Sequence, residues 1–331
     1  MLDIGIVGLG GIGNNHARCY AENKYTRVVA VCDIDKSRAD SAATRWDAQP
    51  YYSVRQMLKS GINLDACSVT TAGIENGGDH YRPTMELLQA NIPVLGEKPI
   101  SNDVSEARRM VALSKKKRIS YGVNLNHRFT PSAIRAKEWL TEGRLGELNI
   151  VNMTMWINNP NESSPWFHIR ALHPHSLDVM RYFAGEVESV QSFFKKGKGR
   201  KIWSNVQVNL LFKNGVIGHL TGSYDAGGSY GLETLELVGS EGRVIINEAC
   251  EKLSFYPRFS QEVESFDHLG GMGGFSETFS SRIGAWVDDL RKNTPPSKVN
   301  AKAEDALKVQ LIIESIIKSW ETSKIVKVPQ K

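Results

Sequence analysis

The chain has 331 residues and a formal net charge of +5, with 41 lysines and arginines against 36 acidic residues. This length exceeds what one hydrophobic core usually organises, so we expect two domains. The basic clusters at residues 115–118 and 195–201 lack interleaved aromatic residues and any nucleic-acid motif, so we expect no nucleic-acid partner. Because no apolar run approaches the ~20 residues that cross a bilayer, we also expect no membrane partner.

The cysteines indicate a reducing compartment. None of the four forms a Cys-x-x-Cys pair, and three lie in segments that are predicted to be core. Reduced thiols are the simplest interpretation of that pattern. The first apolar run begins at Leu2 without a basic leader, so no signal peptide is predicted and we expect a cytoplasmic protein.

A glycine-rich turn follows the first predicted strand. Residues 2–7 are an apolar run, the sequence Gly-Leu-Gly-Gly-Ile-Gly comes next, and residues 14–23 are predicted to form a helix. In this context Gly8 permits a tight turn, Gly10 lets the backbone approach a pyrophosphate, and Gly13 lets the helix pack closely on the strand. The helix N-terminus adds partial positive charge for the phosphates. The residues predicted here to bind a dinucleotide are Gly8, Gly10, Gly11, Ile12 and Gly13.

An acidic residue ends the second predicted strand. Residues 27–32 form that strand, and Asp33 follows it, twenty residues after Gly13. A carboxylate at this place accepts hydrogen bonds from both ribose hydroxyls of NAD and repels the 2′-phosphate of NADP. Arg38 is close enough in sequence to weaken that repulsion, so the cofactor is predicted to be NAD, with NADP left open. A βαβ core that binds nothing is the alternative, and the agreement of strand, glycines, helix and acid favours the cofactor.

A third strand, at residues 64–69, ends in two threonines. Thr70 and Thr71 begin a glycine-rich loop over residues 72–79, which is longer than a minimal connection and suggests part of a site wall. Ligands of open α/β sheets bind outside the carboxyl ends of the strands. We therefore predict that Thr70 and Thr71 contact the cofactor.

A lysine follows the next buried strand. Residues 92–95 are apolar, and the sequence Gly-Glu-Lys-Pro comes directly after them. Pro99 restricts the backbone of Lys98, and the strand end places that lysine where ligands bind. Glu97 and Lys98 are accordingly predicted to border the cofactor, with Lys98 also binding the substrate and taking part in catalysis. A polar turn that merely closes the strand is the alternative.

The composition changes after the strand predicted at residues 119–123. Beyond Gly146 the apolar period becomes two, as at residues 206–210, which is typical of antiparallel strands with one wetter face. We therefore predict an α/β architecture in two parts. A Rossmann domain with a doubly wound sheet covers residues 1–123. An α+β domain with a large, mostly antiparallel open sheet covers residues 124–331 and serves substrate binding and oligomerisation.

A second group of candidate residues lies within residues 166–178, which hold three of the eight histidines. His175 and Asp178 are three residues apart, so on a helix they share a face. Histidine is the usual group for proton transfer near neutral pH, and a carboxylate nearby can orient it. We predict that both are catalytic. The residues predicted to contact the substrate, together with Lys98, are Trp166, His168, Arg170, His173 and His175.

Two other interpretations of these histidines are open. A His-x-His pair can ligate zinc, but no cysteine or acid falls at a familiar ligand spacing, so no metal site is predicted here. Histidines at the start of a helix can also be structural, with their ring nitrogens satisfied by backbone groups.

Together these motifs resemble the Gfo/Idh/MocA oxidoreductase family. The resemblance runs over essentially the whole chain and rests on the glycine-rich turn Gly8–Gly13, Asp33, Glu97–Pro99, the segment Asn124–Phe129, and His175 with Asp178. It implies a Rossmann domain followed by an open-sheet domain that commonly mediates homodimers or homotetramers. It also implies a cis Lys98–Pro99 peptide and binding of the reacting carbinol by Lys98 and His175. Asn126 and Arg128 join the predicted cofactor-binding set on the same basis.

One position departs from the family pattern. Members that resemble inositol dehydrogenase carry an aspartate four residues before the histidine, and here that residue is Ala171. The role of the aspartate passes to Asp178, to His173, or to no residue. The expected activity is that of an NAD(P)-dependent dehydrogenase or keto-reductase acting on a sugar, polyol or glycoside. The alternatives are redox-assisted glycoside hydrolysis and a non-catalytic, NAD-binding regulatory protein.

Overall fold

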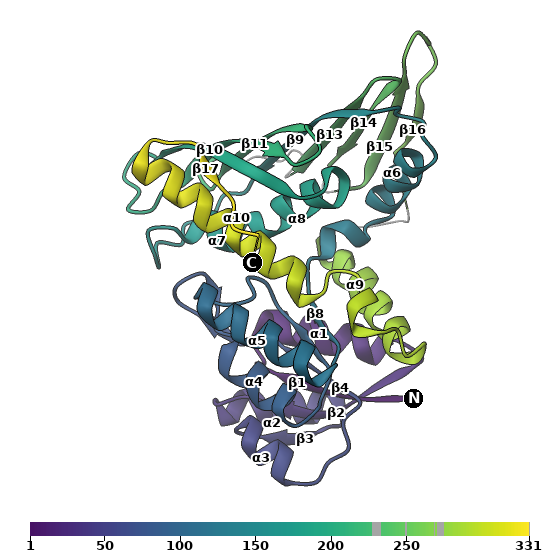
Figure 1. Ribbon diagram of the computed structural model, residues 1–331. Coiled ribbons are helices and arrows are strands. Elements are labelled where there is room, and N and C mark those ends of the chain that lie inside the picture. The colour runs from purple at the N-terminus through teal and green to yellow at the C-terminus, as the bar shows by residue number, and fades with distance from the viewer. Residues whose placement is uncertain (227–232, 249, 268, 270–274, 331) are drawn as a thin grey trace. The chain divides into compact units, whose positions relative to one another are not determined.

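The computed structural model describes residues 1–226, 233–248, 250–267, 269 and 275–330, and the chain divides into two compact units (Figure 1). Unit 1 comprises Met1–Leu125 and Phe279–Leu307, and unit 2 comprises Asn126–Thr278 and Lys308–Lys331. The sequence predicts one change of domain, after residue 123. In the structure the chain instead returns to unit 1 over residues 279–307, because apolar side chains of that segment are part of the core of unit 1.

Unit 1 is organised around a parallel sheet. Among the described residues this sheet has six strands in the order β3-β2-β1-β4-β7-β8. The strands are β1 (Leu2–Val7), β2 (Thr26–Cys32), β3 (Gln49–Tyr51), β4 (Ala66–Val69), β7 (Val94–Gly96) and β8 (Tyr121–Val123). A small ribbon of β5 (Ala72–Gly73) and β6 (Gly77–Gly78) follows β4. The strand order reverses between β1 and β4, and ligands of such sheets bind in the crevice at that reversal.

Helices connect these strands, as the doubly wound prediction requires. They are α1 (Gly11–Glu22), α2 (Lys36–Trp46), α3 (Val54–Lys59), α4 (Tyr81–Gln89) and α5 (Val104–Lys117). Local signals begin two of them: Asp35 accepts the backbone N–H of Ser37 at 3.0 Å to cap α2, and Asp103 accepts that of Ser105 at 2.7 Å to cap α5. The central strands β1, β4 and β7 are mostly apolar, as is typical of a parallel sheet covered by helices on both faces.

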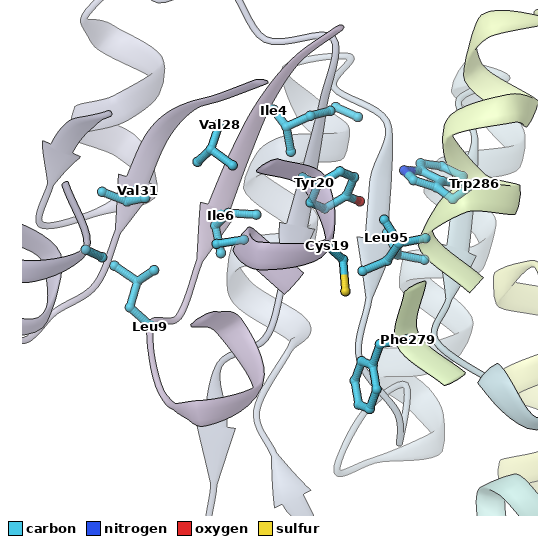
Figure 2. Close-up of a cluster of buried hydrophobic side chains, with 14 of the residues drawn as sticks. Ile4, Ile6, Leu9, Cys19, Tyr20, Val28, Val31, Leu95, Phe279 and Trp286 are labelled. Atoms are coloured by element: carbon cyan, nitrogen blue, oxygen red, sulfur yellow. The ribbon is translucent and has the colours of Figure 1, made fainter. Parts of the chain in front are cut away.

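The core of unit 1 combines the first strands with a segment from far along the chain (Figure 2). Ile4 and Ile6 of β1 and Tyr20 of α1 are fully buried in the same cluster as Phe279 and Trp286 of α9 (Phe275–Arg291). Trp286 is also fully buried. Burying side chains of this size contributes roughly 1.5–3 kcal/mol each, so the late segment is an integral part of this unit's stability.

Unit 2 is organised around a mostly antiparallel sheet. Its described residues form nine strands in the order β16-β15-β14-β13-β9-β12-β11-β10-β17, in which only the β9–β12 pair is parallel. They are β9 (Leu148–Trp156), β10 (Val187–Lys195), β11 (Asn205–Phe212), β12 (Ile217–Ser223), β13 (Glu233–Gly239), β14 (Gly242–Asn247), β15 (Lys252–Pro257), β16 (Glu264–Phe266) and β17 (Val326–Lys327). Residues along β11 alternate between buried and exposed, which is the period of two that the sequence predicts.

Helices lie on one face of this sheet (Figure 1). They are α6 (Pro131–Thr141), α7 (Phe167–Ala171), α8 (His173–Ala184) and α10 (Ala303–Thr322), and the short 3₁₀ helix η1 (Asn126–Phe129) precedes α6. Thr130 caps α6 by accepting the backbone N–H of Ala133 at 3.2 Å, with Pro131 in the first turn. Throughout the described part of the chain, no helix combines the length and the apolarity that crossing a membrane would need.

Candidate active site

The glycines of the turn between β1 and α1 differ in whether the fold leaves room for a side chain. Gly8 has a φ of +92° and Gly13 lies so close to it that a Cβ on Gly13 would be 1.8 Å from the Gly8 carbonyl oxygen. A Cβ on Gly10 or Gly11 would meet no protein atom within 4 Å. The fold itself therefore requires Gly8 and Gly13 to lack a side chain. Gly10 and Gly11 instead leave open space before the N-terminus of α1, as close approach of a pyrophosphate needs.

Asp33 is fixed by the same turn. One carboxylate oxygen accepts the backbone N–H of Leu9 at 2.7 Å, and the other accepts that of Asp35 at 2.9 Å. Asp33 retains 9% of its surface exposed. Since an ionised carboxylate has about four acceptor positions, acceptor capacity is left for ribose hydroxyls.

The glycine-rich turn and Asp33 border one cavity of about 530 Å³ within unit 1. Of the residues predicted to bind the cofactor, those that line it are Gly8, Gly10, Asp33, Arg38, Thr70 and Thr71. The Thr70 hydroxyl donates to the Gly8 carbonyl at 2.6 Å and so holds β4 against the turn. The exposed Arg38 pairs with Asp35 at 3.5 Å. An open turn, a held carboxylate and a cavity beside both are what an adenine dinucleotide requires, and the residues present fit NAD.

Glu97 is the centre of a buried polar network directly after β7. One of its carboxylate oxygens lies 2.9 Å from Nε2 of His16 and accepts the side-chain amide of Asn124 at 2.5 Å. The other ring nitrogen of His16 lies 3.0 Å from the hydroxyl of Ser68. Burial by itself raises the pKa of Glu97, but the hydrogen bond and charge of His16 and the charge of Lys98 outweigh it, so the pKa is lowered. Glu97 is therefore a buried carboxylate that stays ionised beside the lysine.

Lys98 is held in place by its neighbours on both sides. Its backbone N–H donates to the Glu97 carboxylate at 3.1 Å, and the Lys98–Pro99 peptide is cis, as the family resemblance implies. His80 lies with Nδ1 2.8 Å from the Pro99 carbonyl oxygen. Lys98 is half-buried, and desolvation lowers the pKa of its amine, although the charge of Glu97 opposes that shift. An amine with a lowered pKa releases and takes up protons more readily near neutrality.

In unit 2, His175 and Asp178 both lie on α8 and are both buried, with exposed fractions of 3% and 1%. The His175 ring stacks on that of His127, with centroids 4.3 Å apart and 20° between the planes. Asp178 accepts both arms of the Arg128 guanidinium, with 2.7 Å to Nε. This two-armed ion pair was not expected from the sequence, which placed Arg128 with the cofactor and Asp178 with His175. Asn126, which was predicted together with Arg128 to bind the cofactor, donates its side-chain amide to Thr278 within unit 2.

The four residues predicted to contact substrate beside His175 all have partners within unit 2. His168 and His173 are fully buried, with their Nε2 atoms 3.0 Å apart. Burial lowers the pKa of His168 to about 3 and that of His173 well below its usual value, so both rings are neutral. Arg170 donates to both carboxylate oxygens of Glu314, at 3.0 and 2.9 Å. Trp166 stacks on Trp203 with centroids 5.8 Å apart. These contacts account for all four side chains, and a substrate role for them stays a prediction.

Sequence reasoning missed two features of the site. His16 was not singled out, although it lies three residues after Gly13, on the helix that opens at the glycine turn. The sequence indicates no role for His127, and its carboxylate partner Glu233, with Oε2 at 2.6 Å from Nδ1, lies more than 100 residues away. The position of His16 on α1 could have indicated a place near the glycine turn, whereas no local sequence feature indicates the pairing of His127 with Glu233.

Comparison with known proteins assigns both parts of the chain. Residues 2–125 match the oxidoreductase family with an NAD-binding Rossmann fold, and residues 133–245 match the Gfo/Idh/MocA C-terminal domain. The chain is 26% identical to inositol 2-dehydrogenase of Rubrobacter xylanophilus over 318 residues, covering 90% of this chain and 85% of that protein. It is 23% identical to myo-inositol 2-dehydrogenase of Thermotoga maritima, covering 99% and 98% of the two chains.

Solved structures share the fold. A levoglucosan dehydrogenase in complex with NADH superposes with a TM-score of 0.87 at 21% identity, covering 100% of both chains. An oxidoreductase from Agrobacterium radiobacter, solved with NAD⁺, L-tartaric acid and magnesium, gives a TM-score of 0.87 at 18% identity, covering 99% of this chain and 98% of that one. With its dinucleotide cavity, its lysine after β7 and matches over both parts of the sequence, the chain belongs to the Gfo/Idh/MocA family of NAD-dependent oxidoreductases.

Proposed function

We propose that this enzyme transfers a hydride between NAD and a carbinol or keto carbon of a sugar or polyol, with an inositol-like ring as the first class to test. The observation that carries the proposal is the half-buried Lys98, held by Glu97 and His80 at the strand end where ligands bind. The names of the relatives, inositol 2-dehydrogenase among them, support the substrate class. When bound, NAD supplies the hydride acceptor or donor at its nicotinamide ring.

Lys98 is proposed to hydrogen-bond the reacting oxygen of the substrate. Its ammonium group stabilises the negative charge that develops on that oxygen when the carbon is oxidised. Desolvation lowers the pKa of Lys98, which lets the amine share in moving the hydroxyl proton. Glu97 keeps the lysine backbone in place through its 3.1 Å hydrogen bond, and its negative charge partly opposes the lowering of the Lys98 pKa.

His175 is proposed to take the hydroxyl proton during oxidation and to return it during reduction. A buried imidazole on the first turn of α8 is suited to that role because histidine is the side chain that most often transfers protons in enzymes. Asp178 is paired with the guanidinium of Arg128, so we assign it a positioning role: the ion pair ties α8, the helix that carries His175, to η1. We propose that this ion pair takes over the role of the aspartate that Ala171 replaces.

The cofactor preference is proposed to be NAD over NADP. Asp33 is held at the cavity with its carboxylate oriented by Leu9 and Asp35, and a 2′-phosphate would meet that negative charge. Arg38 lines the same cavity, but its guanidinium lies beside Asp35. NADP is therefore proposed to bind, more weakly.

A homodimer or homotetramer is proposed to form through the sheet of unit 2. Its strand register places four large apolar side chains on the face opposite the helices: Trp156, Phe193, Leu211 and Ile217. Their exposed fractions range from 38% to 57%. Polar side chains such as Gln207 and His219 lie between them on the same face, so the proposed interface pairs two such faces through separate apolar contacts. Sedimentation velocity of the purified protein tests the proposal, and a monomer at micromolar concentration would overturn it.

The activity is tested by following reduced-nicotinamide absorbance with NAD or NADP and a panel of inositols, aldoses and glycosides. Lys98→Met is the matched control, since methionine keeps the length of the side chain without its amine. We expect reduction of NAD with at least one polyol or sugar, and loss of that signal in the variant. Cleavage of a glycoside without net NADH would favour redox-assisted hydrolysis. Silence across the panel despite NAD binding would favour a regulatory protein, and either result would overturn the proposal.

A further inference from the structure

A buried cluster of three different donor side chains lies in unit 2. The residues are His127 in η1, Glu233 at the start of β13, and Cys250 just after β14. A ring nitrogen, a carboxylate oxygen and the sulfur all lie within 4.8 Å of one another. Their exposed fractions are 3%, 4% and 4%. We propose that these three side chains bind one divalent transition-metal ion of the zinc class, with a fourth coordination position left open.

The donor set fits that class of ion. Imidazole nitrogen, thiolate sulfur and carboxylate oxygen are the three donors that proteins use for zinc, and sites with three protein ligands and one open position are typical of catalytic zinc. Calcium and magnesium prefer sites built from oxygen alone, so a cluster containing a thiol and an imidazole disfavours them. Because the site is buried, the cost of desolvating the cation has to be offset by its bonds to the carboxylate and the thiolate.

The geometry is close to what an ion requires. With metal–ligand distances of about 2.0–2.3 Å, donor atoms around a tetrahedral ion lie roughly 3.3–3.7 Å from one another. Here Nδ1 of His127 lies 2.6 Å from Oε2 of Glu233, and all three donors fall within 4.8 Å. Side-chain rotations that move the donors by about 1 Å reach the tetrahedral spacing. On binding an ion, the 2.6 Å contact between His127 and Glu233 would open by about 1 Å.

The backbone holds the cysteine toward this cluster. Cys250 has a φ of +72°, which non-glycine residues rarely adopt and which persists where surrounding contacts enforce it. The Ser132 hydroxyl donates to the Cys250 carbonyl at 2.7 Å, and both groups are buried. Ser132 in turn lies on α6, directly after η1, so the cysteine is fixed relative to the segment that carries His127.

Charge balance favours the ion as well. A neutral imidazole, a carboxylate and a thiolate together carry two negative charges, which a divalent cation neutralises, so the buried site has no net charge. Binding forms bonds from the metal to N, O and S. It releases the thiol proton of Cys250, and the imidazole of His127 binds through a neutral ring nitrogen. No oxidant or reductant is needed.

The site lies next to the proposed catalytic histidine, because His127 stacks on His175 with centroids 4.3 Å apart. Metal binding itself does not depend on the proposed function and is measured without a substrate.

The test uses the full-length protein, stripped with a chelator and reloaded with Zn²⁺ or Co²⁺ under reducing conditions. Metal per chain is counted by mass spectrometry after gel filtration, and the cobalt form is examined for a thiolate-to-metal charge-transfer band and for tetrahedral visible bands. Cys250→Ser and Glu233→Gln remove ligands while keeping side-chain size. Cys19→Ser and His219→Gln are the matched controls, since Cys19 lies in unit 1 and His219 on β12, outside the cluster.

We expect about one ion per chain in the wild type and in both controls. Cys250→Ser should lose the charge-transfer band, and both ligand variants should bind the ion at least roughly 100-fold more weakly. Circular dichroism establishes that the variants fold, and if one does not, the wild-type cobalt spectrum decides alone. Absence of stoichiometric metal, a cobalt spectrum without a thiolate band, or unchanged affinity in folded Cys250→Ser would each overturn the proposal and leave a hydrogen-bonded His–Glu pair with a thiol beside it.

Discussion

The same substitution at two glycines of one turn should have opposite consequences. Gly10→Ala should leave the fold intact and weaken NAD binding, whereas Gly13→Ala should destabilise unit 1. The reason lies in what a new methyl group would meet. At Gly13 the Cβ would be 1.8 Å from the Gly8 carbonyl oxygen and 2.8 Å from the Thr70 hydroxyl, while at Gly10 it would meet nothing within 4 Å.

The magnitudes follow from those contacts. Overpacking a well-packed region costs about 1–3 kcal/mol and occasionally more, and a backbone clash as close as that at Gly13 belongs at or beyond the upper end. Gly10 has a φ of −69°, which alanine adopts without strain, so Gly10→Ala should stabilise the free protein by about 0–1 kcal/mol. Displacing the pyrophosphate from even one charged hydrogen bond costs about 1.5–3 kcal/mol. That corresponds to roughly a 10- to 100-fold rise in the Kd for NAD.

Two assays separate these effects. Urea unfolding of the free protein gives the stability of each variant, and titration of NADH fluorescence gives cofactor affinity. Gly10→Ala with wild-type affinity for NADH would refute the assignment of the open space to the pyrophosphate. Gly13→Ala with wild-type stability would refute the packing argument.

Three further predictions concern unit 1. Asp33→Asn should raise the Kd for NAD by roughly 10-fold and bring it closer to the Kd for NADP, because a neutral amide neither accepts hydrogen bonds from both ribose hydroxyls nor repels a phosphate. Calorimetric titration with both cofactors checks this, and an unchanged ratio of the two affinities would contradict it. His16→Ala should lower the free energy of unfolding by about 3–5 kcal/mol, because Glu97 would remain buried without that partner; a urea midpoint equal to that of the wild type would exclude the ion-pair account. The wild type should be more stable than Glu97→Gln by a constant amount above the ordinary pKa of 4.5. This difference in the free energy of unfolding should shrink as pH falls through the lowered pKa of the folded state, because the unfolded chain then binds the proton more readily than the native one. Unfolding curves from pH 3 to 7 test it, and a difference that grows toward acid pH would contradict it.

The Rossmann fold around the predicted dinucleotide site could be read from the sequence because its signals are local. Gly8, Gly13 and Asp33 lie within one strand–turn–helix–strand segment, where each spacing is set by the length of an element. The position of Lys98 directly after a buried strand was predictable in the same way, since the end of such a strand is visible in the sequence and parallel strands end at a common edge. The alternation in β11 likewise indicated a sheet with one wet face.

The features that sequence missed depend on contacts between distant segments. The spacing of His175 and Asp178 predicts a shared helix face, but the partner that neutralises Asp178 is Arg128, 50 residues earlier. Phe279 and Trp286 belong to an apolar stripe along a helix. Such a stripe predicts a buried face but does not indicate which core it packs in, so the sequence does not reveal their contact with Ile4 in unit 1. Tertiary packing decides such pairings, and periodicity alone does not encode them.

The central claim is that Lys98 and His175 serve one chemical step, and a double-mutant cycle on kcat/KM tests it most directly. Lys98→Met and His175→Asn would be made singly and together, and assayed with NAD and the best polyol or sugar of the panel. We predict that each single change lowers kcat/KM by roughly 10²- to 10⁴-fold and that the double variant is about as impaired as the worse single one, because groups that act as a unit are not additive. A double variant whose loss equals the product of the two single losses would mean that the residues act independently, and would contradict the account.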